Sequence, residues 1–167
     1  MPTVMVSGNF AAIILPLTRL SGARVELERG LSAGGDKART KVRKALRDQT
    51  NVKRYSSIVS RSPSHRSGLT YTIEGQGKGL PIAEFPVQAT AAGVEAEPWG
   101  VAHLFKRSFA MAKGFRARLT SRRFPIRALY GPSIAKEIGK DKSLNAFESA
   151  VRTDVMPAVM ARLEALV

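Results

Sequence analysis

The sequence predicts an α+β fold, in which an antiparallel sheet of about four strands packs with a long N-terminal helix and a C-terminal helix. Three observations lead to this class. Residues 21–50 and 133–167 carry apolar side chains at helical spacing, and residues 68–127 alternate with period two. The chain has 167 residues, 44% of them apolar, with no repeat and no long linker. Residues 1–167 are therefore expected to form a single domain.

The N-terminal helix is expected over residues 21–50, after an apolar arm or strand at 1–20. Its stripe recurs at spacings of three, four and seven residues and consists of Leu20, Leu27, Leu31, Ala38, Val42 and Ala45. Gly30, Gly34 and Gly35 interrupt it at up to about 1 kcal/mol each relative to alanine. The segment is thus either one kinked helix or two shorter ones. Its small residues would let another backbone approach closely.

The sheet is expected within residues 68–127. In "GLTYTIEGQG", Leu69, Tyr71 and Ile73 alternate with polar residues, as in a half-buried strand. The prolines of "GLPIAEFPV" favour an edge strand or an irregular crossing. "GVEAEPWG" alternates again.

Two further segments, 101–111 and 114–123, predict a hairpin. In its second strand Phe115, Ala117 and Leu119 face one way, and Arg116, Arg118 and Thr120 face the other. The sheet is therefore expected to have a polar, basic side.

Residues 133–167 predict the helical C-terminal part. Ser133 is placed to cap a short helical turn, and Ser143 to cap the main helix. The apolar stripe of that helix consists of Leu144, Phe147, Val151, Val155, Ala158 and Leu166. Pro157 is expected to kink or restart it. Arg162 falls on the stripe, so the helix end is either frayed or faces an acidic neighbour.

The net charge of +14 comes from two blocks. Residues 37–66 carry +9 and residues 101–127 carry +8, whereas 67–100 carry −3 and both ends are neutral. Such a surplus indicates anionic partners, although a solvated helix surface would show the first block equally well. The candidate interface or DNA-facing residues are Lys37, Lys41, Lys44, Arg39, Arg43, Arg47, Lys106, Arg107, Arg116, Arg118, Arg122 and Arg123.

Little in the sequence indicates catalysis. Cysteine is absent, which excludes disulfides, thiolate zinc sites, iron–sulfur clusters and cysteine nucleophiles. His65 and His103 lie too far apart to indicate a zinc site, and Glu95 and Glu97 on one strand face lack a nucleophile or metal partner. "GQGKGL" lacks the spacing of a phosphate-binding loop. We expect no enzyme activity, no cofactor and no metal.

No membrane partner is expected either, because the apolar run at 10–17 is far shorter than the roughly 20 residues that span a bilayer. It also lacks the basic flank of a secretion signal. Trp99 and Phe105 could stack on bases beside Lys106 and Arg107, but a core or interface role is favoured for Trp99. We take Trp99 and Tyr130 as candidate interface anchors.

The order of these segments resembles the prophage minor tail protein Z family, the tail-completion proteins of long-tailed phages. The segments that carry the resemblance are "GLPIAEF", "PWG" before a basic strand, and "FPIRALYGPSI", within residues 24–160. None is a catalytic motif. The resemblance implies a virion protein at the head-proximal end of the tail, assembled in the bacterial cytoplasm. By analogy with neck proteins, it implies a self-associated ring, expected to be a hexamer, around the DNA channel.

The partners implied are the tail terminator or tail tube protein, the head–neck connector or stopper protein, and genomic DNA in the lumen. The alternative is a basic, sequence-tolerant nucleic-acid-binding protein, since phosphate neutralisation also requires many Lys and Arg side chains. A channel lined by the whole surplus would hold DNA instead of letting it slide. We therefore expect much of the surplus to face neighbouring proteins or the outside, and only part to face the lumen.

Overall fold

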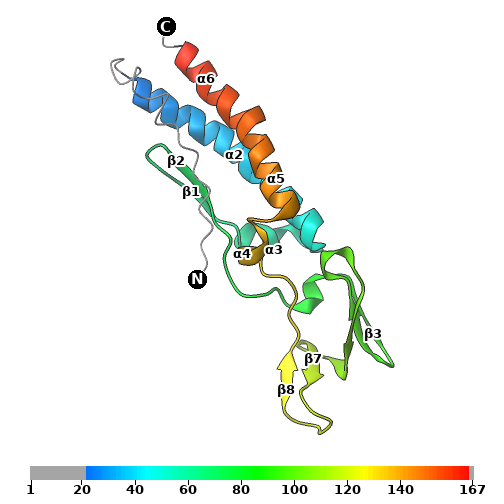
Figure 1. Cartoon of the computed structure of the whole chain (residues 1–167). Coiled ribbons are helices and arrows are strands. Elements are labelled where there is room, and N and C mark those ends of the chain that lie inside the picture. The colour runs from blue at the N-terminus through cyan, green and yellow to red at the C-terminus, as the bar shows by residue number, and fades with distance from the viewer. Residues whose placement is uncertain (1–21, 166–167) are drawn as a thin grey trace.

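A computed structural model describes residues 22–165, so the arm expected at 1–20 and Leu166 lie outside the described residues. The molecule is elongated, with a pair of long helical segments at one end and two of its three small β-sheets at the other (Figure 1). The α+β class is confirmed. The eight strands form three small antiparallel sheets in place of one sheet of about four.

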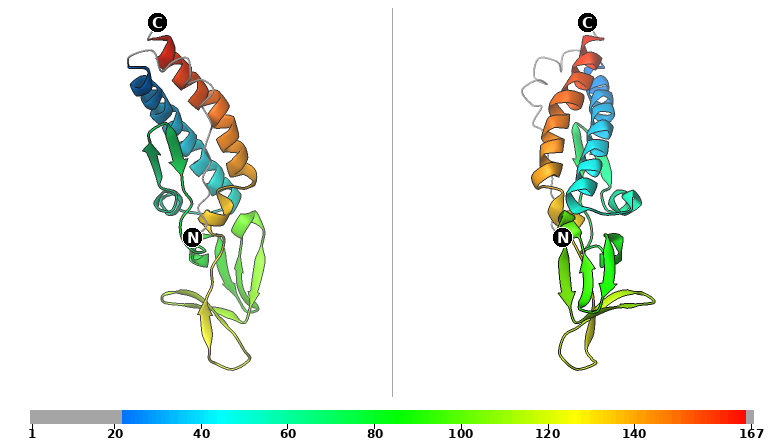
Figure 2. Two further views of the ribbon diagram at one scale, coloured as in Figure 1. Left: turned by 60° about the vertical axis from the view of Figure 1, so that its left-hand side comes forward. Right: turned by 90° about the vertical axis from the view of Figure 1, so that its right-hand side faces the viewer.

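Helix α2 (Ala23–Thr50) is continuous over 28 residues. It runs antiparallel to α5 (Asp141–Ala150), the π-helical turn η3 (Val151–Val155) and α6 (Met156–Glu164), as both views in Figure 2 show. The glycines of α2 do not break it. A Cβ on Gly30 would lie 2.8 Å from the Cα of Val159, and one on Gly34 would lie 2.6 Å from the Cα of Val155. Close packing of two backbones therefore explains these glycines, as expected for small residues in the stripe.

The C-terminal helix restarts where Pro157 predicts it. Pro157 lies in the first turn of α6, where its missing N–H costs no helical hydrogen bond, and the wide turn η3 precedes it. Arg162 does meet an acidic neighbour, since its Nη1 lies 3.6 Å from Oε2 of Glu26 on α2. Ser143 lies inside α5 and donates to the carbonyls of Glu137 and Lys140, so it does not cap the helix.

The strands between residues 64 and 106 form two sheets. Strands β1 (Ser64–Ser67) and β2 (Thr70–Ile73) form a hairpin that lies along α2. Tyr71 on β2 packs against two clusters of buried apolar side chains, one that contains Phe85 and one that contains Leu31 of α2. Strands β3 (Val87–Thr90), β4 (Gly93–Ala96) and β5 (His103–Lys106) form the second sheet in that order. The polar segment around His65 forms strand β1, and the His65 side chain is exposed, as the polar composition of the segment indicates.

The third sheet contains β6 (Ser108–Met111), β7 (Gly114–Arg118) and β8 (Ile126–Ala128). The hairpin expected between 101–111 and 114–123 is therefore only partly right: β6 pairs with β7, but β5 pairs with β4. Arg107 between β5 and β6 has a φ of 58°, which turns the chain from one sheet into the next. Leu119, expected on the inward face, is 50% exposed because β7 ends before it.

The main core lies between the helices and the sheets. The segment around the 3₁₀ turn η1 (Ile82–Glu84) crosses irregularly, as its prolines indicate, and buries Leu80, Ile82 and Phe85. It pairs with the segment after β8: Leu80 N–H donates to Pro132 O at 2.9 Å, and Gly131 N–H donates to Leu80 O at 2.8 Å. Two of the segments that carry the family resemblance, "GLPIAEF" and "FPIRALYGPSI", therefore pair with each other in the core.

Three short helices complete the fold, namely α3 (Tyr55–Ser60), the 3₁₀ turn η2 (Pro98–Gly100) and α4 (Ile134–Glu137). Ser133 stands before α4 as expected, but its hydroxyl donates to Gly77 O at 3.0 Å. A buried polar cluster joins α2 to α4 and α5. Gln49 Nε2 donates to Glu137 Oε2 at 3.0 Å, and its Oε1 accepts from Ser143 N–H at 3.1 Å.

Candidate functional site

Three arginines on one flank of α2, Arg39, Arg43 and Arg47, are predicted as candidate interface residues but make contacts inside the chain. Arg39 Nη1 donates to Ser64 Oγ at 3.1 Å, and Arg43 Nε donates to Ser62 Oγ at 2.9 Å. Arg47 donates to two backbone carbonyls just beyond the helix. Burial lowers the pKa of Arg43, and the charge of Arg39 adds to this effect. Arg39 therefore joins α2 to β1, Arg43 joins it to the segment between α3 and β1, and Arg47 joins it to the segment that follows the helix.

The lysine flank of α2 is more open. Lys41 Nζ lies 2.5 Å from Asp154 Oδ2 and 3.2 Å from Thr153 Oγ1, which links α2 to η3. The hydrogen bond from Lys41 lowers the pKa of Asp154. Lys37 and Lys44 are exposed and form no ion pair among residues 22–165.

Other members of the first block are also engaged. Arg66 Nη1 lies 2.7 Å from Glu28 Oε2, and the hydrogen bond from Arg66 is the main cause that lowers the pKa of Glu28. Arg61 Nη1 donates to Lys78 O at 2.7 Å. Six of the ten basic side chains at 37–66 therefore hold internal contacts. The formal +9 of this block overstates the charge that is free to meet a partner.

The second block lies at the far end of the molecule from the helix pair, on β6, β7, β8 and their loops (Figure 1). We call this end, residues 106–127, the basic tip. It carries eight basic residues and no acidic one. None of the eight forms an ion pair with a carboxylate in the part of the chain that the structure describes. The basic tip is therefore the main free positive surface of the described chain.

A hollow of about 360 Å³ opens in the basic tip and is lined by Arg107, Ser108, Phe109, Arg118, Thr120 and Ser121. Arg118 N–H donates to Arg107 O at 3.0 Å, so the β6–β7 register places the two arginines opposite each other. The guanidinium of Arg118 lies over the Phe109 ring, 5.5 Å from its centroid. The side chains in this hollow that can hydrogen bond offer donors and no carboxylate, which suits an anion.

The remaining predicted residues of the second block spread around the hollow. Arg122 and Arg123 are exposed in the loop between β7 and β8, and Arg123 lies over the ring of Phe124, 5.7 Å from its centroid. Arg116 is half-buried and opposite Phe109. Lys106 is exposed at the end of β5. The structure thus gathers these six second-block candidates at one end, away from the first block.

The two candidate anchors are exposed. Trp99 is 47% exposed and has a φ of 58°, which is rare for a large side chain. Its ring lies edge-on to His103, with centroids 6.3 Å apart, on the outer strand β5. Tyr130 is 59% exposed, while its backbone bridges to Pro81. Both side chains are free to contact a partner.

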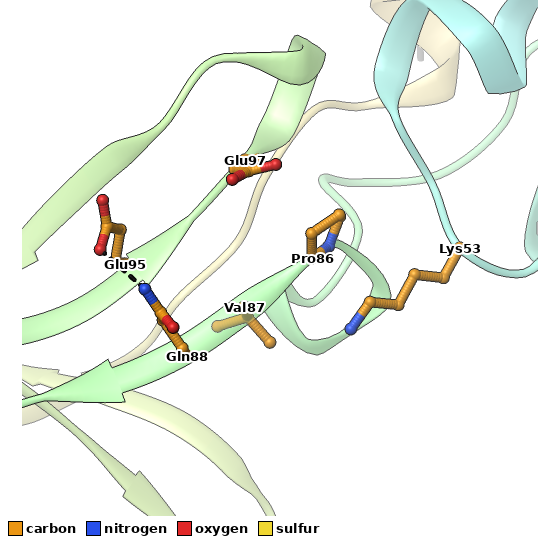
Figure 3. Close-up of a pocket in the computed structure, with 6 residues that line it drawn as sticks. All are labelled: Lys53, Pro86, Val87, Gln88, Glu95 and Glu97. Atoms are coloured by element: carbon orange, nitrogen blue, oxygen red, sulfur yellow. Dashed lines mark hydrogen bonds between the residues drawn. The ribbon is translucent and has the colours of Figure 1, made fainter.

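Figure 3 shows a second hollow, of about 340 Å³, lined by Lys53, Pro86, Val87, Gln88, Glu95 and Glu97. Gln88 Nε2 donates to Glu95 Oε2 at 3.0 Å, and the Glu97 side chain is exposed. Lys53 supplies a positive charge across the hollow (Figure 3). The hollow therefore brings one cation and two carboxylates together, and Glu95 is already engaged by Gln88.

Among residues 22–165, no group of three or more His, Asp or Glu side chains is placed to hold a metal ion. No helix in the same range has the length and apolar character needed to cross a bilayer. Comparison of the chain with family models, curated proteins and solved structures finds no match.

Sequence reasoning named five of the six arginines of the basic tip and placed Thr120 on the face of Arg116 and Arg118, but it missed Arg127, Lys113, Ser121 and the hollow. The signal for Thr120 was alternation along β7. The hollow depends on the backbone at Arg107, and no local pattern encodes that conformation.

Proposed function

We propose that this chain is a structural subunit of a long-tailed phage or phage-like particle. In this role it is a tail-completion or minor tail protein at the head-proximal end of the tail, and copies of it form a ring around the DNA channel. The ring joins the tail, through its terminator or tube protein, to the connector or stopper protein of the head–neck complex. The observation that carries the proposal is the cluster of eight basic residues, none in an ion pair among residues 22–165 and with no acidic residue between them, at one end of an elongated subunit.

This arrangement suits a closed heterologous ring, because such a ring needs different surfaces on the two sides and two ends of each copy. The basic tip offers one surface, and the exposed Trp99 and Tyr130 offer apolar anchors elsewhere. The segments that carry the family resemblance divide between the core and the surface: Ile82, Phe85 and Ile134 are buried, whereas Trp99 and Tyr130 are exposed.

Size in solution and in the particle tests the proposal. We expect the full chain to form a ring-sized oligomer, alone or on a tail, and to be a component of purified particles. Deletion of its gene from a phage gene cluster is expected to leave filled heads and separate tails. A chain that stays monomeric and never enters a particle would contradict the proposal and favour the basic nucleic-acid-binding alternative.

Charge reversal separates folding from joining. Arg116→Glu with Arg118→Glu is expected to impair ring formation or head–tail joining more than folding, because Arg118 is exposed and Arg116 only half-buried. Lys37→Glu with Lys44→Glu makes the same change in charge on the exposed flank of α2 and serves as the matched control. If the arginine variant joins heads to tails normally, the basic tip has no role in assembly.

A further inference from the structure

We propose that the hollow between Arg107 and Arg118 binds a phosphate group of a nucleic-acid backbone, so that the basic tip is where this chain contacts DNA. The inference rests on the proposed function for its setting, because it assigns the lumen-facing surface of the ring. It divides the surplus charge: the basic tip faces DNA, and the first block serves the fold.

The pairing of two like charges is the first step. Arg107 and Arg118 stand opposite each other across antiparallel strands, at the end of the β6–β7 register. Like charges in this position are destabilising when nothing lies between them. No carboxylate among residues 22–165 pairs with either arginine. An anion held between the two guanidinium groups would remove the repulsion.

The backbone at the hollow gives the second step. Arg107 adopts a φ of 58°, a conformation that costs a non-glycine residue about 1 kcal/mol. The Arg118 guanidinium lies over the Phe109 ring, 5.5 Å from its centroid, and this cation–π contact favours that position of the group. Both features hold a charged group in place at the hollow. Strained backbone and fixed side chains of this kind gather at binding sites.

The other lining groups give the third step, the class of ligand. Ser108 is used inside the fold, since its Oγ accepts from Val94 N–H at 2.7 Å and donates to Phe105 O. Thr120 and Ser121 can donate their hydroxyl protons, although Thr120 also accepts from Arg122 N–H at 3.3 Å. Two guanidinium groups and two hydroxyls match the acceptor-only oxygens of a phosphate.

The surroundings favour a backbone phosphate over a free one. Lys106, Lys113, Arg122 and Arg123 are exposed around the same end and would meet further charges along an extended polyanion. Exposed Leu119 and Phe124 stand beside them in the β7–β8 loop. A duplex presents phosphates at close, regular intervals, so contacts at several basic residues are made together.

The test uses the full chain and a labelled random-sequence duplex of about 20 base pairs. Arg107→Gln with Arg118→Gln is compared with Lys37→Gln with Lys44→Gln, which removes the same charge from α2. The tip variant is expected to weaken binding at least about tenfold and to reduce the salt slope by about 2, and the α2 variant to weaken it less than about threefold. Equal losses in both variants would overturn the proposal, as would wild-type chain that fails to bind duplex at about 50 mM salt.

A second variant tests the hollow itself. Thr120→Ala with Ser121→Ala leaves the charge unchanged and removes two exposed hydroxyls together with the exposed methyl of Thr120. A loss of about threefold or more in duplex affinity supports a built phosphate site. Unchanged affinity would mean that the chain binds duplex through diffuse charge alone, and would overturn the proposed phosphate site in the hollow. If the arginine variant weakens binding to poly-glutamate more than to duplex, the tip binds an acidic protein and the proposal is wrong.

Failure of this inference and failure of the proposed function have different signatures. A ring that forms normally and does not bind duplex overturns the phosphate site and leaves the ring. A chain that binds duplex through the hollow and never enters a particle overturns the ring and leaves the site. The thermal midpoint of the arginine variant is expected to stay level or rise, because the change removes a like-charge pair.

Discussion

Gly34 on α2 lies so close to Val155 on η3 that a Cβ on the glycine would sit 2.6 Å from the Cα of the valine. The contact joins two backbones, and neither can rotate away as a side chain would. It sets the distance between the two long helical segments. Gly30 repeats the contact against Val159 one helical turn earlier on α2.

Gly34→Ala is therefore expected to destabilise the protein by about 2 kcal/mol, although alanine is the better helix former. The measurement is chemical unfolding followed by circular dichroism. The control is Ala33→Gly on the exposed side of the same helix, which is expected to cost about 1 kcal/mol through helix propensity alone. A Gly34→Ala protein that is more stable than wild type would contradict the packing of α2 on η3.

Two glutamine–glutamate hydrogen bonds of the same length offer a test of burial. Gln49 donates to Glu137 in the interior, and Gln88 donates to Glu95 on the outer side of β4, each at 3.0 Å. Gln49→Ala is expected to cost about 2–3 kcal/mol, since it leaves a buried carboxylate without its donor. Gln88→Ala is expected to cost less than about 0.5 kcal/mol because water replaces the lost donor. Similar costs would show that the Gln49 cluster is open to water.

The Lys41–Asp154 ion pair predicts a pH dependence of stability. Because Lys41 lowers the pKa of Asp154 below its ordinary value of 3.8, the carboxylate stabilises the fold above that value. This stabilisation is lost as the pH falls through the lowered pKa.

Lys41→Met is expected to be less stable than wild type by about 0.5 kcal/mol at pH about 7, and the difference is expected to shrink as the pH falls below 3.8. Thermal unfolding at several pH values measures it. Lys44→Met is the matched control, because Lys44 is exposed and has no ion pair among residues 22–165. A difference that stays constant down to pH about 2 would remove Asp154 from the explanation.

The backbone at Trp99 reverses a usual order of substitution. Its φ of 58° favours glycine, so Trp99→Gly is expected to be about 1 kcal/mol more stable than Trp99→Ala. Leu104 on the regular strand β5 is the control, where the alanine variant is expected to be the more stable one. Unfolding midpoints of the four variants decide this. The opposite order at Trp99 would show that its backbone is not left-handed in solution.

Both Trp99 variants are also expected to weaken assembly, because they remove an exposed aromatic anchor. Sedimentation of the purified chain and its content in particles measure this effect. A Trp99→Ala chain that assembles as wild type would remove Trp99 from the set of anchors.

Much of the secondary structure follows from local pattern. The expected helix at 21–50 is observed at Ala23–Thr50. It could be predicted because the apolar stripe depends only on the spacing of residues that are close in sequence. The alternation of apolar and polar residues also correctly predicted a strand at Thr70–Ile73 and the burial of Ile73. The division into three sheets was not predicted, since strand pairing joins residues that are distant in sequence and the boundary between the second and third sheets falls at a positive φ at Arg107.

The candidate site was likewise only partly predictable from local sequence. The composition locates both basic blocks but does not tell which of their charges are paired within the fold. Arg39 and Arg43 find partners about 20 or more residues away in sequence, at Ser64 and Ser62. Arg107 and Arg118 find no carboxylate among the described residues. Local spacing carries no information about which distant groups meet, so the two blocks could not be told apart.

The sequence by itself determined the α+β class, the places of the two basic blocks and the absence of cysteine chemistry, because composition and periodicity are properties of the chain alone. Only the tertiary structure decided which charges remain free. Long-range pairing uses most of the first block to fix α2 on its neighbours, and it leaves the second block unpaired at the far end. Free charge depends on three-dimensional neighbours, and the fold alone sets those neighbours.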